Sequence, residues 1–90
     1  MRDQFEQFLI RKGYSKETPS GHPSTVYDYL KRIDSVCKEE HYSWGQLAAS
    51  IDSIVRQYDV GGKKQDIGEK SHRAVINALK QFQEFVNIHP

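Results

Sequence analysis

The chain has 90 residues, of which 37% are hydrophobic and 28% charged, and its formal net charge is +1. These values are typical of one small globular domain and exclude both a disordered tail and a second domain. Cys37 is the single cysteine, which excludes an internal disulfide and favours a reducing compartment. No run approaches the roughly 20 apolar residues of a membrane span. We therefore expect a cytoplasmic domain with no membrane contact.

The first predicted helix covers residues 3–12, with Asp3 as a candidate cap, and ends before Gly13. Its apolar spacing predicts burial of Phe5, Phe8 and Leu9. A stretch rich in turn residues follows over 14–23, where two prolines and a glycine exclude a helix.

The second helix is expected to begin at Ser24 or Thr25, because Thr25 with Asp28 resembles a capping box. Its inward face is predicted to consist of Val26, Leu30, Ile33 and Cys37.

The third helix is predicted over residues 43–59, because Ser43 and Gln46 form a capping-box pattern and one continuous apolar face follows. A polar, basic loop over 60–70 leads to a fourth helix over 71–86, with Ser71 placed to cap its start. The expected fold is therefore all-α, a small bundle of four helices. The residues expected to meet in its core are Leu9, Leu30, Ile33, Trp44, Ile51, Val55, Leu79 and Phe82.

Residues suited to catalysis are scattered. The four histidines show no metal-ligand spacing, and Cys37 lies on an apolar helix face, as a core thiol would. The run Gly61-Gly62-Lys63-Lys64 lacks the spacing and the Ser/Thr of a phosphate-binding loop. We expect no enzyme activity, no metal and no cofactor.

Positive charge is concentrated late in the chain. Residues 60–80 hold five Lys or Arg against two acidic residues, a local charge of +3. This distribution is compatible with a phosphate-binding patch. The five basic residues are Lys63, Lys64, Lys70, Arg73 and Lys80.

The order of these elements resembles the N-terminal core-binding, SAM-like domain of tyrosine recombinases, the phage-integrase family. The resemblance covers almost the whole chain as a single domain over residues 1–90. It is carried by Phe8-Leu9, Gly13-Tyr14-Ser15 and Thr25-Val26-Tyr27, by Trp44, Leu47 and Ile51, and by Ser71, Arg73, Ala78, Leu79, Phe82, Phe85 and Val86. The link between Ser15 and Thr25 is longer than usual, so Thr18 competes with Thr25 for the Thr that opens the second helix. The family's catalytic domain is missing from this sequence, as expected of an excised domain or a free-standing relative.

The resemblance implies a non-catalytic clamp on double-stranded DNA, with a recombinase catalytic domain or another protein as a further partner. The four lysines of the patch would contact phosphates, while Arg73 and Asn77 are of the types that pair with base edges. Hydroxyls at helix starts, Ser71 and Thr25, would bind phosphate. Lys31 and Arg32 on the second helix would add to the surface.

A competing interpretation is a free-standing helical protein-interaction module without DNA affinity. The near-neutral net charge favours it, as do the acidic residues Glu39, Glu40, Asp52 and Asp59. A helix-turn-helix regulator is a third alternative, but the predicted connections are longer than its usual turn of about 3–4 residues.

Overall fold

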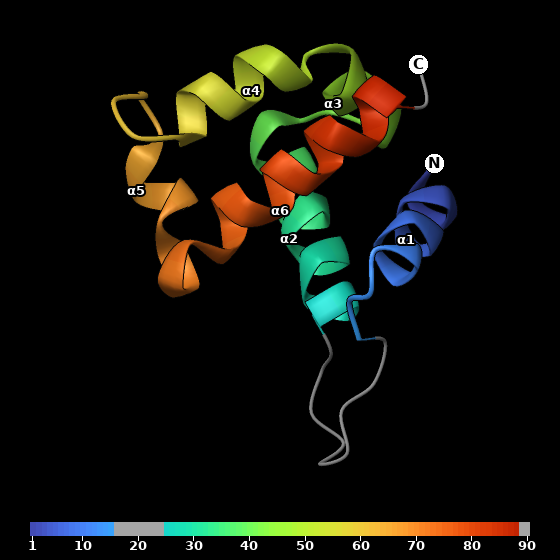
Figure 1. Cartoon of the computed structure of the whole chain (residues 1–90). Helices are drawn as coiled ribbons and strands as arrows, with labels where there is room; N and C mark the ends of the chain where they lie inside the picture. The colour runs from blue at the N-terminus through green and yellow to red at the C-terminus, as the bar shows by residue number, and fades with distance from the viewer. Residues whose placement is uncertain (16–24, 89–90) are drawn as a thin grey trace.

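The computed structural model describes residues 1–15 and 25–88, and all regular structure in these ranges is helical (Figure 1). The predicted all-α class is therefore confirmed for the described residues. The predicted count of four helices is wrong, because six are found there. They are α1 (Arg2–Arg11), α2 (Thr25–Glu40), α3 (Trp44–Ala49), α4 (Ile51–Tyr58), α5 (Gln65–Gly68) and α6 (Lys70–Ile88). Most of the predicted turn-rich stretch, with Ser24, lies outside the described residues.

The core is built around α6, which packs against each of the other five helices (Figure 1). Its centre is a cluster of aromatic rings at distances that favour edge-to-face and tilted contacts, such as 5.2 Å between the Phe5 and Phe82 centroids. Seven of the eight predicted core residues are buried. The eighth, Trp44, is half-buried: its ring packs on Phe82 while its indole N–H donates to Asp34 at 2.9 Å.

The first helix begins one residue earlier than predicted, with Met1 rather than Asp3 at its cap. Phe5, Phe8 and Leu9 are buried as expected. Two ion pairs hold α1 in place, Arg2 with Asp34 of α2 and Lys12 with Glu84 of α6. In α2, all four residues of the predicted inward face are buried.

The third predicted helix is broken at Ser50, whose φ of −113° and ψ of 14° interrupt the helical backbone. The capping box at its start is confirmed, with Ser43 and Gln46 each donating a backbone N–H to the other's side chain. Serine competes for backbone hydrogen bonds and favours helix ends, so a break here is chemically reasonable. The break lets α3 and α4 each lay its apolar face against α6.

The predicted loop over 60–70 contains the short helix α5, which two glycines allow to lie against the end of α4. A Cβ on Gly68 would come within 1.9 Å of the Tyr58 carbonyl oxygen, and a Cβ on Gly62 within 2.2 Å of that of Gln57. Both contacts are far shorter than side chains accept, so the close packing of α5 on α4 depends on glycine at both positions.

The start of α6 differs from the prediction that Ser71 caps a helix. Ser71, His72 and Arg73 have φ of 55°, 58° and 69°, which is left-handed backbone, whereas a capping residue is normally extended. The Arg73 N–H bonds to the Glu69 carbonyl at 3.0 Å, which closes a tight turn after α5. Regular helix resumes at Ala74, so Ser71 does not offer a helix N-terminus to phosphate.

Candidate nucleic-acid interface

Lys64 is turned toward the protein rather than outward as a phosphate ligand. Its ammonium lies 2.8 Å from a Glu40 carboxylate oxygen and 5.6 Å from the centre of the Tyr58 ring. The pair is shielded, with 29% of the Lys64 side chain and 14% of the Glu40 side chain exposed. Glu40 also accepts a hydrogen bond from the Tyr58 hydroxyl at 3.1 Å. Burial, together with the Glu40 carboxylate, raises the pKa of Tyr58 far above its usual value.

Asp59, at the end of α4, binds two more of the predicted DNA-contacting side chains. The Lys80 ammonium lies 3.2 Å from one of its carboxylate oxygens, and the Arg73 guanidinium lies 3.7 Å from the other. The backbone N–H of Val60 donates to the same carboxylate at 2.8 Å. That bond, followed by the Lys80 ammonium, holds the pKa of Asp59 below its usual value. At neutral pH Asp59 is therefore a permanent negative charge within the predicted basic patch.

The tertiary structure thus weakens the predicted patch. Glu40 and Asp59 lie outside the segment 60–80 in the sequence, yet their carboxylates contact three of its five basic side chains. Counting them with the two acidic residues of the segment leaves five positive charges against four negative ones. The local excess of +3 that the sequence predicts is largely compensated.

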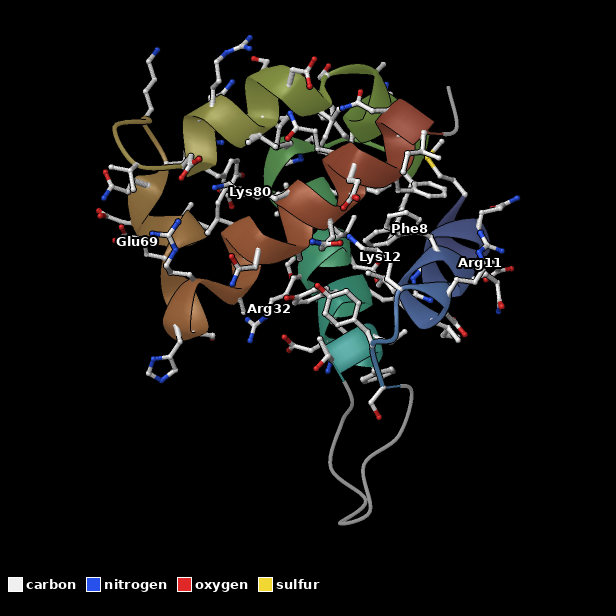
Figure 2. All side chains as sticks on the ribbon, viewed as in Figure 1. Phe8, Arg11, Lys12, Arg32, Glu69 and Lys80 are labelled. Carbon is white, nitrogen blue, oxygen red and sulfur yellow. The ribbon has the colours of Figure 1, made fainter. Side chains whose placement is uncertain are left out.

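Two predicted residues from different helices line one cleft, which lies between α2 and the start of α6. Arg32 of α2 and Lys70 of α6 both line this cleft, which has a volume of about 280 Å³. Figure 2 shows Arg32 projecting from α2 toward the first turns of α6. We call this feature the α2–α6 cleft; it is lined by Arg32, Ser35, Val36, Glu39, Ile67, Lys70 and Val75.

The Arg32 Nε atom is buried, and no hydrogen-bond partner is found for it among residues 1–15 and 25–88. An Asp28 carboxylate oxygen lies 3.4 Å away and forms an ion pair without hydrogen-bond geometry. An unsatisfied buried donor on a charged group is costly.

The remaining predicted site residues are exposed but do not line this cleft. Lys63 is exposed in the turn before α5, and Asn77 is exposed on α6. Thr25 is exposed at the first turn of α2. Lys31, also exposed, places its ammonium 5.3 Å from the centre of the Tyr27 ring. Ser71 is exposed in the left-handed turn.

A second hollow, which the sequence did not predict, lies between α1 and the C-terminal half of α6. It has a volume of about 750 Å³ and we call it the α1–α6 groove. Its apolar lining comes from both ends of the sequence and from α3, which explains why no local pattern indicated it. The apolar residues are Met1, Ala48, Ala49, Phe85 and Val86.

The single cysteine is poorly suited to act as a nucleophile. Cys37 is buried, and burial together with Asp34 raises the pKa of its thiol to about 11, which disfavours the reactive thiolate. Residues 1–15 and 25–88 hold no group of three or more His, Cys, Asp or Glu that would bind a metal ion. Over the same ranges, no helix combines the length and the apolar character that crossing a bilayer requires.

Comparison of the chain with protein-family models, with curated proteins and with solved structures finds no match. Function is therefore inferred from the geometry of this chain.

Proposed function

We propose that the chain is a non-catalytic helical module that binds the phosphate backbone of double-stranded DNA on the side of the α2–α6 cleft. The observation that carries the proposal is the meeting of Arg32 and Lys70 at one cleft, with a buried Arg32 donor that lacks a hydrogen-bond partner among the described residues. Guanidinium and ammonium groups are the usual ligands of phosphate oxygens.

The proposal moves the main phosphate contacts away from Lys64 and toward Arg32 and Lys70. Lys63, Lys31 and Thr25 are exposed and free to contact further phosphates beyond the cleft lining. Arg73 and Lys80 would also contact DNA if each exchanged its ion pair with Asp59 for an ion pair with a phosphate. Exposed ion pairs contribute only about 0–1 kcal/mol, so this exchange is energetically feasible.

The resemblance to the core-binding domain of tyrosine recombinases belongs to the same proposal. Its support is the joint packing of the residues that carry it: Trp44, Leu47, Ile51, Leu79 and Phe82 all belong to one core or pack on it. A coding sequence for the missing catalytic half, adjacent to or continuous with this one, would support the clamp role. In isolation the protein should neither cleave DNA nor form a covalent adduct with it.

Titration of the protein with a short duplex at several salt concentrations tests the proposal. Binding should be weak, with a non-specific Kd on the order of micromolar to 100 micromolar, and should fall steeply with salt. Arg32→Ala and Lys70→Ala should each flatten the log–log salt slope by about one unit. Arg56→Ala is the matched control, because Arg56 is exposed on α4 and does not line the cleft.

Base readout is tested separately on a preferred site. If Arg73 and Asn77 reach base edges, replacing either by Ala should cost about 1–3 kcal/mol there and relax the sequence preference. Absence of binding at low salt, or binding that neither Arg32→Ala nor Lys70→Ala affects, would refute the proposed interface.

A helical protein-interaction module is the second candidate function, and the α1–α6 groove favours it. The groove is larger than the cleft and its lining includes Met1, which is 50% exposed. Apolar hollows of this kind commonly accept a partner's side chains. This function would be favoured over the first if a partner protein shifts the NMR signals of Ala48, Ala49 and Val86 while duplex DNA shifts no signals of the protein.

A further inference from the structure

Four charged side chains on α1 or directly after it fall into two groups. On the side that packs into the molecule, Arg2 pairs with Asp34, while Lys12 pairs with Glu84 and donates to Gln81 at 2.8 Å. On the side that borders the α1–α6 groove, Asp3 and Arg11 are exposed. Within the described parts of the chain, neither of these two makes an ion pair or a side-chain hydrogen bond. The groove therefore has an apolar lining and, along α1, exposed charges of both signs that have no partner among residues 1–15 and 25–88.

The order of these side chains is symmetric about the middle of the helix. Asp3, Gln7 and Arg11 are spaced four residues apart, so they follow one ridge of α1, and all three line the groove. If a second α1 lies antiparallel to the first about a two-fold axis at Gln7, each Asp3 faces Arg11 of the partner subunit. The two Gln7 amides then meet at the axis, where each can donate to and accept from the other. Such self-complementarity is what a two-fold interface requires.

We propose that the α1–α6 groove is the surface through which two copies of this chain associate, with their α1 helices antiparallel. The inference rests on the second candidate function, an interaction role for the groove, and is independent of DNA binding. Self-association buries the apolar lining of both grooves in one step and pairs all four unpaired charges. Because α1 has only 10 residues, about 15 Å of helix, the contact is small and the dimer is weak.

Sedimentation velocity of the whole chain across a range from about 10 micromolar to 1 millimolar tests the proposal. The wild-type protein should shift from monomer toward dimer as concentration rises. Asp3→Arg places Arg opposite Arg11 of the partner subunit, and Arg11→Asp places Asp opposite the partner's Asp3. Each change should weaken dimerisation about tenfold or more, because symmetry applies it twice. The double variant Asp3→Arg/Arg11→Asp should restore it.

Two further variants separate the interface from general effects of charge. Asp66→Arg makes the same charge reversal in the first turn of another helix, α5, outside the groove, and should leave dimerisation unchanged. Ala49→Glu places a carboxylate in the apolar lining without touching Asp3 or Arg11, and should abolish the dimer. Circular dichroism of each variant confirms that the fold is retained.

The outcomes are distinguishable. A protein that stays monomeric throughout, or a double variant that fails to restore dimerisation, overturns the antiparallel pairing. NMR shifts at Ala48, Ala49 and Val86 that depend on concentration in the same way in wild type and in the charge-reversal variants also overturn the antiparallel pairing. They would still leave the groove as an interaction surface. If neither a partner nor a higher protein concentration shifts the NMR signals of these residues, the second candidate function is refuted as well.

Discussion

The α2–α6 cleft and the α1–α6 groove show opposite relations between sequence and surface charge. The segment 60–80, which contributes Ile67, Lys70 and Val75 to the α2–α6 cleft, is rich in lysine and arginine, but Glu40 and Asp59 pair with three of its basic side chains outside the cleft lining. Along the α1–α6 groove the sequence has no excess of either sign, yet Asp3 and Arg11 are left without partners among the described residues. Charge density along a chain is therefore a poor guide to the charge that a surface presents.

The two hollows share one element, α6, whose first turns border the cleft and whose last turns border the groove. Substitutions in the buried face of α6 should affect both surfaces through stability. Substitutions of surface ion pairs should affect one surface alone.

Leu79→Ala should have the largest effect, because Leu79 is fully buried on the segment of α6 between the two hollows. The loss should be about 2–5 kcal/mol in the free energy of unfolding, enough to threaten a domain of this size. Chemical denaturation followed by circular dichroism measures it. Ile88→Ala, at a side chain that is 56% exposed on the same helix, is the control and should change stability by about 0.5 kcal/mol or less.

Gly68→Ala should cost about 1–3 kcal/mol, because the added methyl group collides with the Tyr58 carbonyl and forces α5 away from α4. The change should disturb the cleft, where Ile67 and Lys70 flank this position, and leave the groove intact. Gly45→Ala is the matched control: its Cβ would meet nothing closer than 3.9 Å, so α3 should be stabilised by up to about 1 kcal/mol. Equal losses in the two variants would contradict the proposed packing of α5.

Glu40→Gln should cost about 1–2 kcal/mol, because it removes the charge that pairs with the half-buried Lys64. If DNA binds on this side, the same change should increase affinity by removing a negative charge. Chemical denaturation measures the loss of stability, and titration with duplex DNA measures the change in affinity. Asp66→Asn, at an exposed position outside the cleft lining, separates this local effect from a general change in net charge.

Asp59→Asn should have the smallest effect on stability and a clear dependence on pH. The pKa of Asp59 is lower in the folded state than in the unfolded chain. Its contribution to folding stability is therefore fully present above the ordinary aspartate pKa of about 3.9, and it is lost as the pH falls through the lowered folded-state pKa. Wild type and variant should therefore differ slightly at neutral pH and converge in acid. Thermal unfolding at a series of pH values tests this, and a difference that grows in acid would contradict it.

The local pattern of the sequence predicted much of the fold. Apolar spacing of three and four residues identified the buried faces of α1, α2 and the regular part of α6, because a helix must place such residues on one side. The capping box at Ser43 was also predictable, because its two hydrogen bonds join residues only three apart. Short-range chemistry of this kind needs no knowledge of the rest of the chain.

Tertiary structure alone decided the break at Ser50 and the identity of the paired charges. Each depends on residues that are distant in sequence: α6 accepts α3 and α4 at separate sites, and Asp59 reaches Arg73 and Lys80 only after α4 folds back over α6 (Figures 1 and 2). The sequence by itself determined which faces are apolar and where most helices lie. Which charges remain free to meet a partner was decided by packing, because an ion pair forms wherever the fold brings opposite charges within about 4 Å, whatever their separation along the chain.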